Sequence, residues 1–217
     1  MVAPTGNSPP FFAVSPTVKR MGFGAVSFTV DDVQLMVAEQ VLPEDSTVEL
    51  LDGTIVYRDR FDLEGGEIVP GIEHDFVVGA LADLNGSIKT EARHLRTETT
   101  LVCGPNHAPI PDACILRGTL RDYATRFPTA ADAWCVVEVA DSSYDRDAGE
   151  KLAGYARAGV GQYVIINLRT RTAEVHANPL ADAGTYSNRV VVAEGDKLSL
   201  QVGLSQFFEV PLASLLP

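Results

Sequence analysis

The chain has 217 residues, which is enough for one domain with a sizeable core. Hydrophobic residues make up 46% and charged residues 21%, which argues against disorder over the whole length, and no apolar run is long enough to span a membrane. The net charge of −12 contrasts with the excess of Lys and Arg on which nucleic-acid binding usually depends.

The N-terminal segment and the cysteines bear on location. Residues 1–27 are rich in Pro, Gly and Ser and lack the basic flank and continuous apolar stretch of a secretory signal. We expect an irregular arm there, followed by one domain over residues 28–217. Cys103, Cys114 and Cys135 lie far apart with no C-x-x-C pair, so we expect reduced cysteines in a cytoplasmic protein.

The first half of the domain predicts helices and short strands. Thr29 is a candidate N-cap for a helix over residues 31–42, which has acids in its first turn. Residues 48–57, VELLDGTIVY, predict a hairpin around Asp-Gly. Residues 58–71 are polar and glycine-rich and predict a loop, whereas residues 73–88 carry apolar side chains at helical spacing.

The middle of the domain predicts a sheet with a β-α-β unit. Residues 96–102 and 112–118 are expected strands on either side of a proline-containing break. Residues 133–140, AWCVVEVA, are almost continuously apolar, as in a strand covered on both faces. A helix over residues 145–160 and a second apolar strand over residues 162–169 complete the unit.

The C-terminal part predicts short antiparallel strands and a terminal helix or turn. These elements are expected at residues 172–177, 186–192, 197–202 and 204–217, in that order. The predicted fold class is therefore α/β with a central mixed β-sheet flanked by helices.

Glu138 is the sharpest chemical anomaly, because it interrupts the apolar run of residues 133–140. A buried carboxylate without a partner either destabilises the fold or takes up a proton, so a nearby cation would stabilise it. The plainer alternative is that Glu138 lies at the end of its strand and meets solvent or an arginine.

Asp112 supplies a second acid at the start of the strand over residues 112–118. On its own, Pro111-Asp112 is most often just a turn. If its strand neighbours that of Glu138, the two carboxylates form the oxygen-rich site that Mg²⁺ prefers, with water and phosphate in the remaining positions. The pair therefore indicates a divalent-metal site.

Lys151 lies on the helix predicted over residues 145–160. Asp147 stands four residues before it and Tyr155 four residues after it, so the three side chains share one helix face. A solvated ion pair beside a tyrosine is the ordinary outcome of such spacing. In the functional interpretation, the lysine side chain lies next to the metal, assists the attacking water and stabilises the negative charge that develops in phosphate hydrolysis.

The segments VELLDG, EH before a helix, PDACILRG, VVEVADSS and YARAGVGQYVIIN occur in this order along the chain. Together they resemble the Uma-two family of the PD-(D/E)-x-K restriction-endonuclease-like superfamily, over residues 28–217. The resemblance implies a mixed sheet flanked by helices, with an N-terminal hairpin and C-terminal strands. It also implies an Mg²⁺-dependent endonuclease acting on DNA, with Mn²⁺ as a substitute, that commonly forms a homodimer.

The resemblance assigns roles to three central residues. Asp112 and Glu138 become the metal carboxylates. The family's lysine position two residues after the second acid is Ala140 here, so Lys151 from the next helix takes its role.

The resemblance also indicates further site residues. Glu49 matches an early strand acid that would act as a catalytic residue and reach the metal through water. His74, ahead of the long helix, and Gln162, after the glycine turn, match supporting positions, and Gln162 would position Lys151. Asp147 and Tyr155 complete the supporting set.

Two other classes of function stay open. The net charge of −12 favours a nuclease fold that binds nucleic acid or a protein partner without cutting. An acidic enzyme or interaction protein unrelated to nucleic acid is a residual alternative, although the sequence has no G-x-S-x-G, phosphate-binding glycine loop or H-E-x-x-H motif to support one.

Overall fold

A computed structural model describes residues 26–42, 48–57, 60–61, 67–68 and 71–217. The predicted N-terminal arm lies almost entirely outside these described residues. Within them, no helix is long and apolar enough to cross a membrane.

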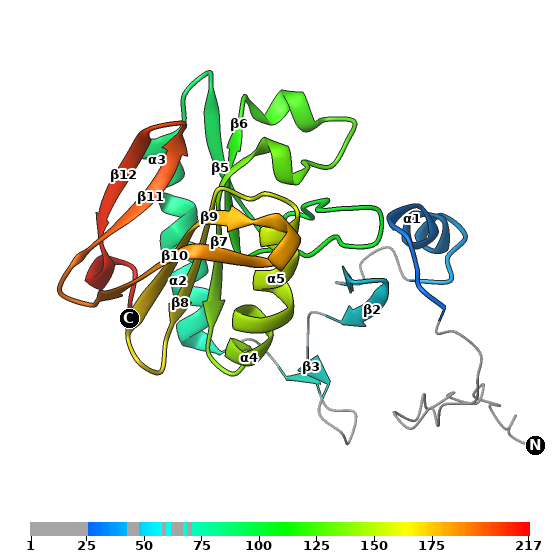
Figure 1. Cartoon of the computed structure of the whole chain (residues 1–217), viewed down its shortest axis with the longest axis horizontal. Helices are drawn as coiled ribbons and strands as arrows, with labels where there is room; N and C mark the ends of the chain where they lie inside the picture. Colours follow the sequence, from blue (N-terminus) through cyan, green and yellow to red (C-terminus); the bar gives the residue numbers. More distant parts are fainter. Residues whose placement is uncertain (1–25, 43–47, 58–59, 62–66, 69–70) are drawn as a thin grey trace, which may run out of the picture.

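A six-stranded mixed sheet forms the centre of the molecule (Figure 1). Its strands are β5 (Arg93–Thr97), β6 (Ala113–Arg117), β7 (Ala133–Ala140), β8 (Gln162–Asn167), β9 (Thr172–Leu180) and β10 (Thr185–Ala193). Their order is β10-β9-β8-β7-β6-β5, with β7 and β8 parallel and the other neighbours antiparallel. The predicted α/β class with a central mixed sheet is confirmed.

The connection from β7 to β8 is the predicted β-α-β unit, but its helix is not regular. It consists of α4 (Tyr144–Arg146), a π-helical turn (Asp147–Lys151) and α5 (Leu152–Arg157). The helix ends where Gly159 adopts a φ of 79°, a conformation that favours glycine. The sequence predicted one continuous helix. The structure instead has a wider π turn in the middle of this helix, and Lys151 is the last residue of that turn.

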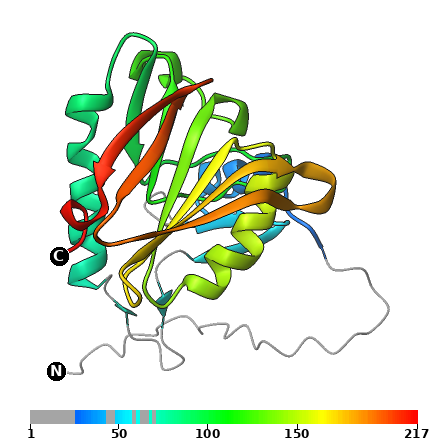
Figure 2. The same cartoon turned by 60° about the vertical axis from the view of Figure 1, so that its left-hand side comes forward.

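Helices cover both faces of the sheet (Figures 1 and 2). One face packs against α2 (Ile72–Asp83), α3 (Asn85–Ile88) and the hairpin of β11 (Lys197–Gly203) and β12 (Gln206–Pro211). The other face packs against α5, whose Tyr155 and Ala156 are buried against strand residues such as Val136. Two apolar cores therefore lie on opposite sides of one sheet.

Two predicted segments take different forms. The small helix or turn predicted to close the chain is present at Leu212–Ser214. The residues before it form strand β12, which the sequence did not predict; β12 pairs with β11 and buries Val210 in the core. The expected loop after the first hairpin contains two short paired strands, β3 (Arg60–Phe61) and β4 (Glu67–Ile68). Short 3-10 turns also occur at Leu120–Tyr123, Ala130–Asp132 and Ala181–Ala183.

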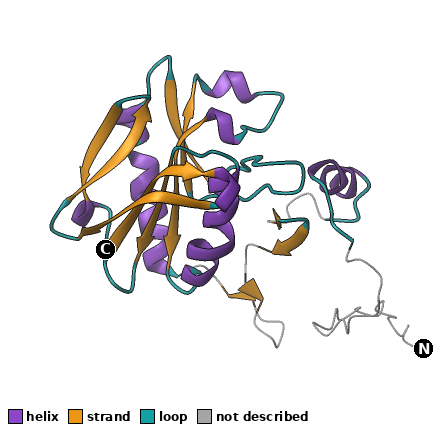
Figure 3. Ribbon diagram, viewed as in Figure 1, coloured by secondary structure: helices purple, strands orange, loops and turns teal. Residues whose placement is uncertain are grey.

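The N-terminal elements lie beside the sheet rather than in it (Figure 3). Helix α1 (Val30–Ala38) begins at Thr29, which forms a capping box with Asp32 as its N-cap position predicts. Strands β1 (Val48–Leu51) and β2 (Thr54–Tyr57) form the predicted antiparallel hairpin. Asp52 and Gly53 form its turn with positive φ angles of 46° and 81°.

Candidate active site

Asp112 and Glu138 face each other across two neighbouring strands. β6 pairs antiparallel with β7, with Ala113 opposite Val137. One residue further on, Asp112 therefore stands opposite Glu138, where Cβ atoms are about 5 Å apart. Both side chains point toward α5, since Val136, two residues before Glu138, lies in the core beneath that helix. Their exposed fractions are only 4% and 3%.

The Asp112 carboxylate is held by groups from two elements. Its Oδ2 accepts the backbone N–H of Val139 at 2.7 Å. The same oxygen lies 3.3 Å from Nε2 of His74, in the first turn of α2. His74, predicted as a supporting residue, therefore contacts the first of the two acids.

Lys151 reaches the second acid from the helix above the sheet. Its Nζ donates to Oε1 of Glu138 at 3.0 Å and lies 2.8 Å from Oε1 of Glu49. The hydroxyl of Tyr155 donates to the same Glu138 oxygen at 2.8 Å. Lys151 and Tyr155 are both buried. Lys151 and Tyr155 therefore lie on one helix face, as predicted, and both side chains bond to Glu138.

Asp147 lies in the π turn beside Lys151. Its Oδ2 accepts the hydroxyl of Ser143 at 2.6 Å, and its backbone carbonyl accepts the hydroxyl of Tyr163 at 2.9 Å. The side chain of Asp147 is buried. Isolated π turns are frequent at functional sites, and here the turn places an acid and the lysine against the same face of the sheet.

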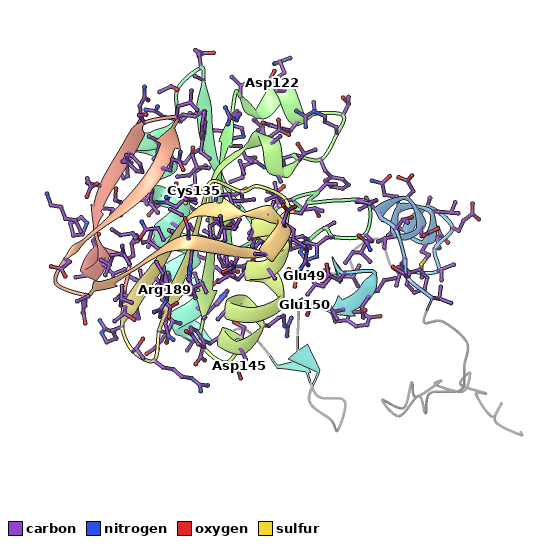
Figure 4. All side chains as sticks on the ribbon, viewed as in Figure 1. Glu49, Asp122, Cys135, Asp145, Glu150 and Arg189 are labelled. Atoms are coloured by element: carbon purple, nitrogen blue, oxygen red, sulfur yellow. The ribbon has the colours of Figure 1, made fainter. Side chains whose placement is uncertain are left out.

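Glu49 enters the site from the hairpin. Figure 4 shows it beside the helix that follows β7. Its Oε1 accepts the backbone N–H of Ile110 at 2.8 Å in addition to contacting Lys151. Its Oε2 is buried without a hydrogen-bond partner, and Nη1 of Arg146 lies 3.8 Å away. The structure therefore joins Glu49 to Glu138 through the lysine.

The site holds more buried acid than buried base. The buried carboxylates around Lys151 are those of Glu49, Asp112, Glu138 and Asp147, and Glu174 is a fifth buried acid further along the sheet. Lys151 is the one buried Lys or Arg among the described residues. A half-buried arginine, Arg146, flanks the group. The site is therefore electronegative, and a bound cation would offset the excess charge.

Burial and mutual repulsion shift the protonation of these groups. Burial raises the pKa of Glu138 well above its usual range; Lys151 partly offsets this, while the neighbouring carboxylates add to it. Burial also raises the pKa of Asp147, against the influence of Lys151. Burial alone would lower the pKa of Lys151, but Glu138 and the other acids outweigh it and hold that pKa above its usual range. The ammonium therefore stays charged at neutral pH.

The donor chemistry fits a hard divalent cation. Carboxylate oxygens are the protein ligands that Mg²⁺ prefers, and Oε2 of Glu49 is a buried acceptor without a donor. Among the residues that the structure describes, no three His, Cys, Asp or Glu side chains are grouped to hold an ion by themselves. Glu49 is thus not assembled with Asp112 and Glu138 as a third direct ligand. Mg²⁺ commonly uses one or two carboxylates with water and phosphate, which the facing pair can supply.

Gln162 does not position the lysine as predicted. Its amide donates to the carbonyl of Ser199 at 3.0 Å and accepts the N–H of Gln201 at 2.7 Å, both on β11. Its side chain lies on the face of β8 that packs against β11, whereas Lys151 lies on the opposite face. Alternation of side chains along the strand therefore separates the two residues.

Sequence reasoning missed Glu174, which continues the row of acids. Glu138 pairs with Ile165 on β8, and Ile165 pairs with Glu174 on β9, so both acids share a sheet face. Glu174 accepts the Tyr144 hydroxyl at 2.7 Å and Nε of Arg189 at 2.9 Å. Arg146 was missed as well. Only the strand register and the helix path bring these residues near the site.

Comparisons with known proteins bear on the family and the fold. The family model described as "Uma2: Putative restriction endonuclease" matches residues 37–213. A solved structure described as a putative nuclease belonging to DUF820 from Anabaena variabilis ATCC 29413 is similar, with a TM-score of 0.63. The similarity covers 87% of this chain and 97% of the other at 14% sequence identity, so it shows a shared fold. No curated protein matches the chain.

Proposed function

Because the chain belongs to the Uma2 family of restriction-endonuclease-like proteins, we propose that it is an Mg²⁺-dependent endonuclease that hydrolyses phosphodiester bonds in DNA. The observation that carries the proposal is the buried contact between Lys151 and Glu138, one strand away from Asp112. Acids on adjacent strands can hold a divalent cation that activates water, and a lysine beside them can stabilise the charge that develops on the phosphate.

In this proposal Asp112 and Glu138 hold the cation, and Mn²⁺ can take its place. When bound, a divalent cation supplies Lewis-acid activation of water and offsets phosphate charge. Glu49 supports the site through Lys151 and through water.

Lys151 acts as a charged donor. Its raised pKa makes it a poor base, so the ammonium orients the attacking water and stabilises negative charge on the phosphate oxygens. The water oxygen bonds to phosphorus, the bond to the leaving oxygen breaks, the water's proton passes to solvent and the leaving oxygen is protonated. Tyr155 and Glu49 keep Glu138 and Lys151 in place for this step.

Cleavage of supercoiled plasmid DNA with Mg²⁺ or Mn²⁺ tests the proposal. We expect Glu138→Gln and Lys151→Ala each to lower the rate at least about a hundredfold, because each removes a group that holds the cation or stabilises charge. Glu209→Gln is the matched control, since Glu209 is an exposed acid on β12. Equal rates for the site variants and the control would rule out these roles.

A non-cutting nuclease fold that binds nucleic acid or a protein partner is the second candidate. The net charge of −12 favours it, because few Lys and Arg are available to neutralise phosphates. Calorimetric titration with Mn²⁺ separates the two. Binding together with cleavage supports the nuclease, whereas no binding at millimolar metal and no cleavage supports the second candidate.

We also propose that the enzyme is a homodimer, as the family resemblance implies, and that it is cytoplasmic, as the three unpaired cysteines predict. Light scattering on the purified protein tests the assembly, with twice the mass of one chain expected. The mass of a single chain would contradict it.

A further inference from the structure

The hairpin that carries Glu49 bonds through its backbone to the loop before β6 rather than to a strand of the central sheet. Leu50 and Ala108 form an isolated bridge, with N–H to O distances of 3.2 and 2.7 Å. The N–H of Gly53 donates to the carbonyl of Asn106 at 2.7 Å. The hairpin itself belongs to a separate two-stranded sheet. The position of Glu49 therefore depends on what else holds this hairpin.

An arginine from the end of α5 binds the hairpin turn. Nη2 of Arg157 donates to both carboxylate oxygens of Asp52, at 2.8 and 2.7 Å. Such charge-assisted contacts are among the stronger hydrogen bonds in proteins. The side chains are 45% and 50% exposed, so the pair adds little to global stability. Its main effect is to fix the turn against the helix.

Two ion pairs join the same two elements in matching register. Glu49 contacts Lys151, and Asp52 contacts Arg157. Three residues of extended chain span about 10 Å, and six residues of helix span about 9 Å. The strand and the helix therefore run side by side with their charged groups at equal spacing. Losing the outer pair would release the turn of the hairpin, three residues along the chain from Glu49.

A third contact lies between these pairs. His107 is buried, and its Nδ1 lies 3.0 Å from Oδ1 of Asp52. Its ring packs on Gly154, where an added Cβ would collide with Nε2. Gly154 lies three residues from each helix member of the two ion pairs. Along the helix, Lys151 contacts Glu49, Gly154 leaves room for the ring of His107, and Arg157 contacts Asp52.

We propose that Asp52 and Arg157 are positioning residues that hold the Glu49 carboxylate against Lys151. They touch no reacting group in the proposed hydrolysis, and they act through the hairpin. The inference rests on the proposed function for its catalytic consequence, but the position of Glu49 can be measured without activity.

The amide proton of Ile110 reports directly on Glu49, because Oε1 of Glu49 accepts it. Hydrogen exchange followed by NMR on the full chain compares wild type, Arg157→Gln and the control Arg126→Gln. The control breaks a comparable ion pair, in which Nη1 of Arg126 lies 2.7 Å from Oδ2 of Asp132 and the arginine side chain is 48% exposed. It lies on a different loop.

We expect Arg157→Gln to speed exchange of the Ile110 and Leu50 amides about two- to fivefold, with a shift of the Ile110 resonance. The amides of β7 should be unchanged in Arg157→Gln, and the control should leave the exchange of Ile110 relative to β7 unchanged. Unchanged exchange in Arg157→Gln, or equally faster exchange throughout β7, would overturn the proposal, since the first shows no positioning and the second a global effect.

Cleavage kinetics separate this proposal from the nuclease assignment. If the wild type cuts DNA, we expect Arg157→Gln to lower kcat with little change in KM. A wild type that does not cut would overturn the nuclease assignment, while the exchange of Ile110 would still decide whether Asp52 and Arg157 position Glu49.

Discussion

Replacing Lys151 by Met removes the buried ammonium and keeps a side chain of similar shape. In the native site, Nζ lies 2.8 Å from Oε1 of Glu49 and 3.0 Å from Oε1 of Glu138. At an effective dielectric of about 20, each contact is worth roughly 6 kcal/mol before the cost of burying the charges is subtracted. Breaking a buried pair from one side therefore typically costs about 3–5 kcal/mol. That is a large share of a domain stability of about 5–15 kcal/mol.

Urea unfolding at neutral pH measures this loss. The double variant Lys151→Met/Glu138→Gln should lose less stability than Lys151→Met alone, because it removes one of the carboxylates left without a counter-charge. A single variant within about 1 kcal/mol of wild type would show that the lysine does not balance the buried acids. A double variant whose loss equals the sum of the two single losses would show that the two groups are not coupled.

Two further predictions concern residues outside the charged cluster. Gly154→Ala should lower the free energy of unfolding by about 1–3 kcal/mol, since its Cβ would collide with the buried His107 ring; a melting temperature equal to that of wild type would contradict this. The Arg126 hydrogen bond lowers the pKa of Asp132 to about 2 from 3.8, so the stability it contributes is present above pH 3.8 and is lost as the pH falls toward 2. The stability difference between wild type and Arg126→Gln should therefore shrink between about pH 5.5 and pH 2.5, and a constant difference would refute it.

Much of the fold could be predicted because its determinants are local. The apolar runs of β7 and β8, the Asp52-Gly53 turn and the Thr29 cap each depend on neighbouring residues. The strand β12 was missed because its pairing with β11 and its packing on the core decide its conformation. The π turn was missed for a similar reason, since tertiary contacts such as Tyr163 to Asp147 accompany it.

Some residues of the candidate site could likewise be recognised from the sequence, whereas the position of others depends on the packed sheet. An acid inside an apolar strand and a lysine at helical spacing could be recognised from residue types, as Glu138 and Lys151 show. The register that brings Asp112 opposite Glu138 could not, because the two residues are 26 positions apart and pairing depends on the whole sheet. Gln162 shows the same limit, since a strand alternates its faces and only the packed sheet shows which face meets the helix.

The position of a bound cation tests the proposed site most directly. Crystals of the protein soaked in Mn²⁺, with anomalous diffraction recorded, would locate it. We expect one strong peak within about 2.2 Å of a carboxylate oxygen of Asp112 and of Glu138, and none in Asp112→Asn crystals treated identically. An absence of any peak near these two acids, with Lys151 still bridging Glu49 and Glu138, would contradict the metal-dependent site.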